Sequence, residues 1–321
     1  MKYVALGDRQ ASAIGLGLWQ FGSREWGWGE DLGEEAAHRI VDRALERGIN
    51  LFDTAELYGG GRSEEILSRA LAGRRDQAII ATKVHPLHAS RKGVVEAADR
   101  SLARLGIDTI DLYQVHWPNR YIPISWTMRG MRDLLDAGKI REVGVSNFRL
   151  SSWLAAERSL GRPVISNQVQ FHLLDQSPMR DLLPYAQRAG RVIIAYSPLA
   201  QGVLGGRYDS GNLPTDFRAA NPQFSGASFE RVAPLLDVLR AVARGHEATP
   251  AQIALAWLLH LPNVIAIPGA RSVEQVEANA AAADIELSQD EWQRLTEAAQ
   301  AVAPRRRRHG IKRVAAWLLG A

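Results

Sequence analysis

The sequence predicts an α/β fold in which strand–helix units close into a single (β/α)8 barrel, the TIM-barrel architecture. Two observations lead to this prediction. Short apolar runs with little alternation recur along the chain, as expected of strands buried on both faces, and stretches with helical apolar periodicity lie between them. Eight such units in about 290 residues fit a closed barrel, whereas an open doubly wound sheet more naturally uses about five to seven strands.

The predicted strands follow one another at regular intervals. They cover residues 11–19, 50–54, 78–84, 109–116, 141–148, 164–172, 191–199 and 264–269. Helices are predicted between and after them, at residues 33–48, 63–73, 94–106, 128–139, 151–160, 179–190, 229–245, 250–260 and 272–284. We expect long loops at the rim formed by the carboxyl ends of the strands.

The helix after the second strand has a recognisable start. Ser63 is expected to be its N-cap, Glu64 and Glu65 suit its first turn, and Gly73 follows its end. Before this helix, the chain places a carboxylate at Asp53 and a phenol at Tyr58, inside a loop rich in glycine.

Composition limits the class of protein. The chain has 321 residues, 46% of them hydrophobic, which is enough for one large core, and no linker divides residues 1–302. It has no cysteine, so it has neither disulfides nor thiolate metal ligands. The first residues lack the apolar run of a signal peptide, and no apolar stretch reaches the ~18 residues of a membrane span. We therefore expect a cytoplasmic protein without a membrane partner.

The positive charge is concentrated in a basic tail at residues 303–321. The formal net charge is +4, but residues 305–313 alone carry six basic side chains, and the rest has 33 basic against 35 acidic residues. This distribution favours a solvated charge run over a nucleic-acid site. The end of the tail has apolar residues at helical spacing and is predicted to dock as a short amphipathic helix on its own barrel, with a second subunit as the alternative. We expect a monomer or a weak homo-oligomer.

Four polar residues lie at the ends of three consecutive strands. Asp53 ends the second strand and Tyr58 follows in its loop, while Lys83 and His116 end the third and fourth strands. In a barrel, such strand ends meet at the rim where active sites form. The four side chains are therefore expected to converge.

These residue types can deliver a proton to an oxygen. Asp53 supplies the counter-charge for a buried Lys83, and that retained positive charge is expected to lower the pKa of Tyr58. His116 can hold a substrate oxygen beside the phenol. No metal-ligand set or nucleophile is evident, so the electrons must come from elsewhere. Taken alone, Asp53 and Lys83 could be a rim salt bridge, and His85 and His88 are interpreted as loop residues.

Several segments together resemble the aldo-keto reductase superfamily, from about Gly15 to about Val302. The resemblance is carried by NLFDTAELYG, ATKV and YQVHW, and also by GLGLWQFG, GVSNF, NQVQFH, AYSPLAQGVLGGRY and IPGARSVEQVEAN. It implies an NAD(P)H-dependent oxidoreductase whose catalytic residues are Asp53, Tyr58, Lys83 and His116. NQVQF has Gln170 where glutamate is common in the family, which we expect to change only a local hydrogen bond.

The resemblance implies NADPH across the carboxyl-end rim, with NADH less favoured. Arg271 is expected to meet the 2′-phosphate, Tyr196 to stack on the nicotinamide, and Asn147 is a further candidate for its carboxamide. The full set of implied cofactor contacts is Trp19, Asp53, Ser146, Asn167, Gln168, Tyr196, Ser197, Leu199, Gln201, Gly202, Arg207, Gly269, Arg271, Gln275 and Asn279.

The implied substrate is a small carbonyl compound. Trp19, Tyr58, His116 and Trp117 are expected to line its pocket, with Trp26 or Trp28 as weaker candidates. Two other functions remain open. A barrel aldolase would use Lys83 as a Schiff-base nucleophile, which a neighbouring Asp53 would disfavour by keeping it protonated. The second is an NADPH-binding redox sensor or regulatory subunit with little turnover.

Overall fold

The computed structural model describes residues 1–24, 27–30, 32–206, 208–215 and 217–302. Three predictions therefore concern residues outside the described part of the chain: a pocket role for Trp26, a pyrophosphate contact from Arg207, and the docking of the basic tail.

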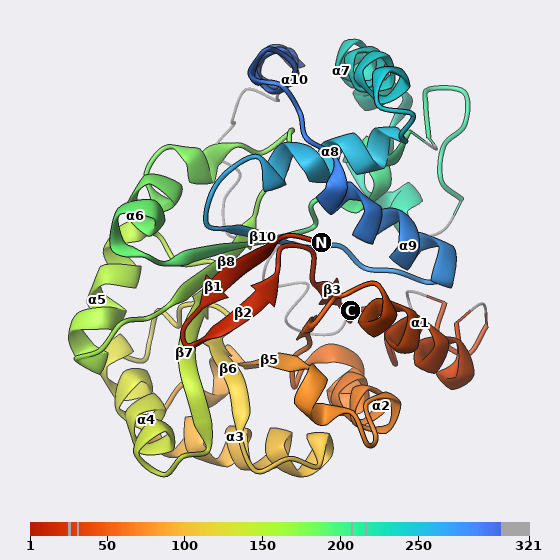
Figure 1. The fold of residues 1–321 in the computed structure, drawn as a ribbon. Coiled ribbons are helices and arrows are strands. Elements are labelled where there is room, and N and C mark those ends of the chain that lie inside the picture. The colour runs from red at the N-terminus through yellow and green to blue at the C-terminus, as the bar shows by residue number, and fades with distance from the viewer. Residues whose placement is uncertain (25–26, 31, 207, 216, 303–321) are drawn as a thin grey trace.

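In the described part of the chain, eight parallel strands form one sheet in sequential order (Figure 1). The strands are β3 (Leu16–Gly17), β4 (Leu51–Asp53), β5 (Ile79–Val84), β6 (Ile110–Val115), β7 (Ile140–Ser146), β8 (Ser166–Gln170), β9 (Val192–Tyr196) and β10 (Val264–Ile267). Backbone hydrogen bonds between the first and last strands close the barrel: Gly15 N–H donates to Ala266 O at 2.8 Å and Gly17 N–H to Pro268 O at 3.1 Å. The predicted barrel is confirmed.

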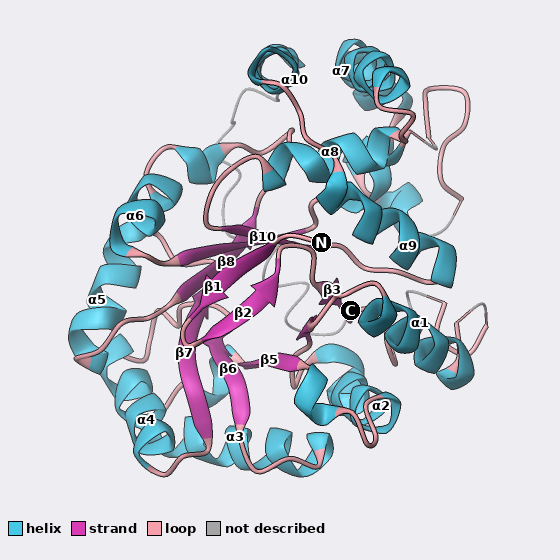
Figure 2. Cartoon of the chain, in the orientation of Figure 1, coloured by secondary structure: helices cyan, strands magenta, loops and turns pink. Residues whose placement is uncertain are grey.

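Helices surround the strands, as Figure 2 shows. They are α1 (Glu34–Glu46), α2 (Arg62–Ala70), α3 (Arg91–Leu105), α4 (Ile124–Asp136), α5 (Leu150–Leu160), α6 (Leu182–Ala189), α7 (Gly226–Gly245), α8 (Pro250–Leu259), α9 (Val273–Ala281) and α10 (Gln289–Val302). Helix α10 was not predicted, and it packs against α7, where Arg231 donates to Val302 O at 2.9 Å. Among the described residues, no helix combines the length and apolar character required to cross a membrane.

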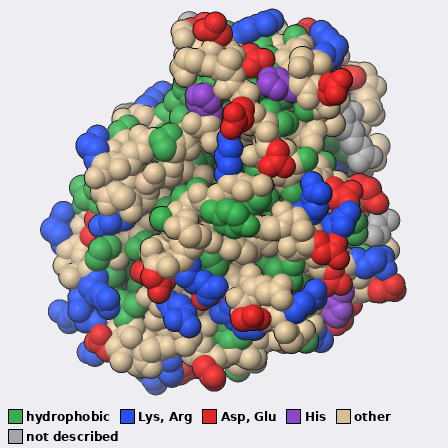
Figure 3. Space-filling model, in the orientation of Figure 1, with side chains coloured by type: hydrophobic (Ala, Val, Ile, Leu, Met, Phe, Trp, Pro, Cys, Tyr) green, Lys and Arg blue, Asp and Glu red, His purple; other side chains and the backbone are tan. Residues whose placement is uncertain are grey.

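A hairpin precedes the barrel and covers its amino-terminal end (Figure 1). It consists of β1 (Tyr3–Leu6) and β2 (Arg9–Ser12), which pair antiparallel across a turn at Gly7. Leu6 and Ala11 join the apolar cluster inside the barrel, and Arg9 donates to Asp111 at 2.9 Å at the start of β6. The predicted first strand was therefore wrong at its start, since its first two residues belong to this hairpin. On this face, basic and acidic side chains are interspersed (Figure 3).

The start of α2 also differs from the prediction. Gly61, at φ 95°, is the N-cap, a left-handed conformation that glycine adopts readily. Ser63 lies inside the helix and is fully buried. Its hydroxyl donates to Leu18 O at 2.9 Å and accepts from the hydroxyl of Thr54 at 2.8 Å. Ser63 thus fastens α2 to the rim between β3 and β4, close to the predicted site.

Candidate active site

Lys83 is the centre of a buried hydrogen-bonded group at the carboxyl ends of β4 and β5. Its ammonium donates to Asp53 Oδ1 at 2.5 Å, to Thr54 O at 2.9 Å and to the hydroxyl of Tyr58 at 3.1 Å. Lys83 is fully buried, and these three contacts match the three N–H donors of an ammonium group. The expected convergence of these side chains is therefore present.

The second oxygen of Asp53 is held by two amides that reach across the barrel from β6 and β8. Gln168 in β8 donates to Oδ2 at 2.7 Å, and Gln114 in β6 donates to the same atom at 3.2 Å. Sequence reasoning did not identify Gln114. Its position two residues before His116, on the same face of the strand, was the available signal.

The pKa shifts of Lys83 and Tyr58 follow from burial and from the neighbouring charges. Burial alone would lower the pKa of Lys83, but the charges of Asp53 and Tyr58 and their hydrogen bonds raise it above its usual value. Burial raises the pKa of Tyr58, and the opposing effect of Lys83 does not reverse this shift. Lys83 acts in the expected direction, but the expectation of a lowered pKa for Tyr58 was wrong, because burial outweighs it. At neutral pH this site holds a charged lysine and a protonated phenol.

His116 lies beside the phenol with its ring enclosed by aromatic side chains. Its ring stacks on Trp117 at 3.7 Å between centroids and meets the edge of Tyr58 at 5.8 Å, while Trp19 lies 6.4 Å from Tyr58. Burial, with the nearby charge of Lys83, holds the pKa of His116 well below its usual value. The imidazole is therefore neutral at pH 7, and among the described residues its Nδ1 has no hydrogen-bond partner.

The structure thus brings together the four residues predicted to line the substrate pocket. Trp28, a weaker candidate, instead packs against the core residue Phe21 with ring centroids 6.0 Å apart. Within the described residues, no group of three or more histidine, aspartate or glutamate side chains is arranged to hold a metal ion.

Asn147 connects the ends of β6, β7 and β9. It has a left-handed backbone, at φ 62°, directly after Ser146. Its amide nitrogen donates to Ser146 Oγ at 3.0 Å and to His116 O at 3.2 Å, and its oxygen accepts from the hydroxyl of Tyr196 at 3.0 Å. Burial raises the pKa of Tyr196 to about 12. Tyr196 is therefore a protonated, anchored ring at the same rim as His116.

Asn167 lies in the barrel wall. Its amide nitrogen donates to Phe148 O at 2.9 Å and its oxygen accepts from Phe148 N–H at 3.4 Å. The side chain is completely buried. Both ends of this amide thus hold the turn after β7, just as both ends of the Asn147 amide are engaged at the rim.

The loop after β9 contains a run of left-handed residues. Ser197, Ala200, Gln201 and Gly202 have φ values of 49°, 50°, 57° and 107°. Such conformations are costly for residues other than glycine and are commonly retained at ligand sites. Predicted pyrophosphate contacts therefore fall on a backbone of unusual shape.

The start of α9 gathers the other predicted cofactor residues. Gln275 accepts from the backbone N–H of Arg271 at 2.8 Å, and Asn279 donates to Gly269 O at 3.4 Å. Gly269 lies against Gln20, where an added Cβ would come within 2.8 Å of the side-chain oxygen. A helix N-terminus with a nearby guanidinium is suited to an anionic group.

Comparisons with known proteins agree with this arrangement. The model of the Aldo/keto reductase family matches residues 13–300. An uncharacterised oxidoreductase of Mycobacterium tuberculosis is 52% identical over 306 residues, 95% of this chain and 94% of the relative. A methylglyoxal reductase of Escherichia coli is 33% identical, over 91% of this chain and 92% of its own length.

The fold of the chain is also similar to that of a solved structure. An aldo-keto reductase from Klebsiella pneumoniae in complex with NADPH has a TM-score of 0.76 and 33% identity, covering 95% of this chain and 96% of its own. The family match spans most of the chain, and this solved relative shares the barrel fold. This chain therefore belongs to the aldo/keto reductase family and is an NAD(P)H-dependent oxidoreductase.

Proposed function

We propose that this protein reduces a small aldehyde or ketone to the alcohol with NADPH, using Tyr58 as the general acid. The observation that carries this proposal is the position of Lys83, which donates to Asp53 and to Tyr58 at once, beside a neutral His116. A proton donor, a fixed positive charge and an oxygen-binding imidazole are what carbonyl reduction requires of the protein.

The bound cofactor supplies a hydride to the carbonyl carbon. As negative charge develops on the substrate oxygen, Tyr58 gives that oxygen its hydroxyl proton, which completes the alcohol. The Lys83 ammonium stabilises the phenolate that remains, and Asp53 keeps Lys83 charged during this transfer. His116 is neutral and orients the substrate oxygen without competing as an acid.

Several residues of the rim suit NADPH. Ser146 and Asn147 offer a hydroxyl and an amide for a carboxamide, and Tyr196, anchored through its hydroxyl, offers its ring for stacking. Asn147 and Asn167 remain alternative contacts for the carboxamide, because both amides already make hydrogen bonds within the protein. Gln168, Ser197, Leu199, Gln201 and Gly202 remain proposed contacts.

Arg271 is the basis for preferring NADPH to NADH. It lies just before the start of α9, where a guanidinium and a helix N-terminus together suit a phosphate. The NADPH in the Klebsiella structure supports the same preference. Gly269, Gln275 and Asn279 complete the proposed contacts at this end of the cofactor.

The proposed substrate is small. Trp19 and Trp117 provide apolar walls around the polar group of Tyr58 and His116. The activity in the name of the Escherichia coli relative is reduction of methylglyoxal, a three-carbon carbonyl compound, which supports this size class.

A direct assay tests the proposal. The purified full-length protein is mixed with NADPH and either methylglyoxal or 4-nitrobenzaldehyde, and the absorbance of the reduced nicotinamide is followed. We expect oxidation of NADPH that depends on the carbonyl and is lost in Tyr58→Phe. NADPH binding without turnover of any carbonyl tested would contradict the proposal and would favour a cofactor-binding regulatory role.

A further inference from the structure

A second histidine, His85, lies beside His116 at the mouth of the barrel. His85 follows β5 in an extended conformation, two residues after Lys83, so alternation directs its side chain to the inner face, nearer the rim. The pairing of β5 with β6 aligns Lys83 with Gln114 and Val84 with Val115. Continuing this register by one residue places His85 level with His116. The two histidines therefore lie level with each other, one residue beyond the ends of the neighbouring strands β5 and β6.

The hydrogen bonding of His85 fixes which ring nitrogen carries the proton. Nδ1 accepts a hydrogen bond from the backbone N–H of Leu87 at 3.2 Å. Burial lowers the pKa of His85, so the ring is neutral at pH 7 and its proton is on Nε2. His85 is 7% exposed, and no described residue accepts a hydrogen bond from Nε2. Nε2 of His85 is not one of the fully enclosed side-chain atoms that lack a partner, so its N–H is open at the rim and can donate to a ligand oxygen.

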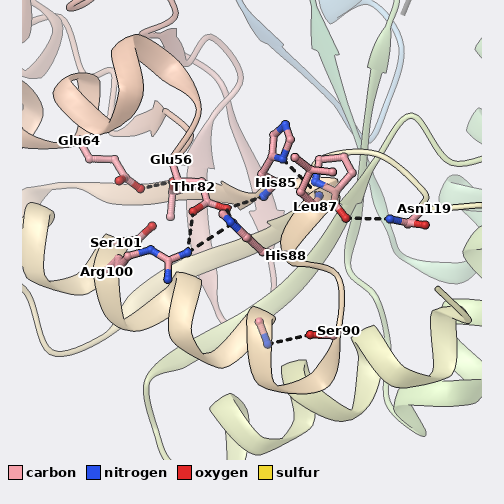
Figure 4. Close-up of polar contacts among 12 residues, drawn as sticks. Glu56, Glu64, Thr82, His85, Leu87, His88, Ser90, Arg100, Ser101 and Asn119 are labelled. Carbon is pink, nitrogen blue, oxygen red and sulfur yellow. Dashed lines mark hydrogen bonds and ion pairs between the residues drawn. The ribbon is translucent and has the colours of Figure 1, made fainter. Parts of the chain in front are cut away.

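The backbone of His85 is held in place by a second group of contacts, shown in Figure 4. The buried carboxylate of Glu56 accepts from His85 N–H at 2.6 Å and contacts His88 Nδ1 at 2.9 Å. Asn119, in the loop after β6, donates to Pro86 O at 2.9 Å. In the figure the His85 ring lies on the other side of its backbone from Glu56. The donor is therefore preorganised and directed away from this group.

Side chains on adjacent strands stand about 5 Å apart, because that is the spacing of hydrogen-bonded strands. Hydrogen bonds from two such imidazoles can reach two oxygens on adjacent carbons. We propose that His85 Nε2–H binds an oxygen on the carbon next to the reacting carbonyl, while His116 binds the carbonyl oxygen itself. His85 is then a specificity-determining residue, and the preferred substrates are α-oxoaldehydes. This inference rests on the proposed function.

The test compares methylglyoxal with propanal, in which a CH2 group replaces the keto group next to the aldehyde. The ratio of their kcat/KM values is measured with NADPH for the wild type, His85→Phe and His85→Gln. Phenylalanine keeps a ring without the donor, and glutamine keeps an N–H donor at a similar reach. We expect the wild-type ratio to favour methylglyoxal and to fall about 10-fold in His85→Phe, the usual effect of one lost hydrogen bond. His85→Gln should restore most of the ratio.

The control variant is His88→Phe, which alters the same loop and the Glu56 contact but not the proposed donor. Its substrate ratio should stay within about twofold of the wild type, since the His85 N–H bond to Glu56 remains. Fluorescence titration of each variant with NADPH should give an unchanged Kd.

Two results would overturn the role of His85. One is an unchanged substrate ratio in His85→Phe, and the other is an equal loss for both substrates, which marks a structural role. A wild-type protein that reduces neither compound would instead contradict the proposed function. A protein that reduces propanal and methylglyoxal equally well would retain the function and reject the inference about His85.

Discussion

Gln168 donates a 2.7 Å hydrogen bond to Oδ2 of Asp53, the carboxylate oxygen that Lys83 does not contact. Gln114 donates to the same oxygen. Both oxygens of this buried carboxylate therefore accept hydrogen bonds, and a side chain with a single acceptor oxygen would leave donors facing one another. The site therefore requires from Asp53 both a negative charge for Lys83 and a second acceptor oxygen for the two glutamines.

Asp53→Asn should destabilise the protein and reduce turnover. The asparagine NH2 would face either Lys83 or Gln168, and the buried ammonium would lose its counter-charge. Breaking a buried ion pair typically lowers the free energy of unfolding by about 3 kcal/mol or more. Urea unfolding measures the change. Asp99→Asn removes the exposed pair with Lys139 and should cost less than about 1 kcal/mol, so equal losses in the two variants would contradict the assigned burial of the Asp53 pair.

Tyr58→Phe should abolish most of the reduction while preserving cofactor binding. The ring remains and only the proton donor is lost, so kcat should fall by ~10² or more. Stopped-flow or steady-state oxidation of NADPH gives kcat, and fluorescence titration gives the Kd of the cofactor. Tyr121→Phe, at a side chain that is 77% exposed, is the control and should be unaffected. Near-normal turnover by Tyr58→Phe would refute Tyr58 as the acid.

Arg271→Ala should weaken NADPH binding and spare NADH. Loss of a charged contact to the 2′-phosphate should cost about 1.5–3 kcal/mol, and NADH has no such phosphate. Quenching of protein fluorescence measures both dissociation constants. Arg39→Ala, which removes a surface pair with Glu35 on α1, serves as the charge-matched control. Equal losses for the two cofactors in Arg271→Ala would assign Arg271 another role.

His172 should make the protein less stable as the pH falls. Burial lowers the pKa of His172 from 6.5 to about 4. Between these values the unfolded chain binds a proton that the folded protein does not, so the free energy of unfolding falls as the pH drops through this window, by up to about 3 kcal/mol at this residue. His116 contributes in the same direction, because its pKa is also lowered.

Urea unfolding at several pH values between about 7 and 4 measures this dependence. His172→Gln removes one titrating group and should flatten the curve in that window. An identical slope in His172→Gln and the wild type would show that His172 does not titrate as its burial indicates.

The sequence predicted the positions of the rim residues because strand ends are marked by residue type. Lys83 and His116 each follow an apolar run, and in a closed barrel such ends meet on one side. The register of β4, β5 and β6 confirms this for Asp53 and its neighbours. The segments that carry the family resemblance include these same strand ends, which the barrel brings together.

Features that depend on burial and on exact contacts were harder to predict from the sequence. The expected direction of the Tyr58 pKa shift considered only the nearby charge, whereas desolvation is the largest effect. Asn147 follows β7 whereas Asn167 lies within β8, and only the structure shows that the first amide bonds to Tyr196 and the second to Phe148. Helix α10 is rich in polar residues, and its burial depends on α7, which a local pattern does not contain.

The hairpin at the amino-terminal end determines how molecules reach Lys83. Leu6 and Ala11 fill that end together with the inward-facing strand residues, and Arg9 fastens the hairpin to Asp111. Reactants and products must therefore share one entrance, on the side where the strands end. Whichever of the two reactants lies deeper has to arrive first and depart last, so the fold itself predicts an ordered sequence of binding and release.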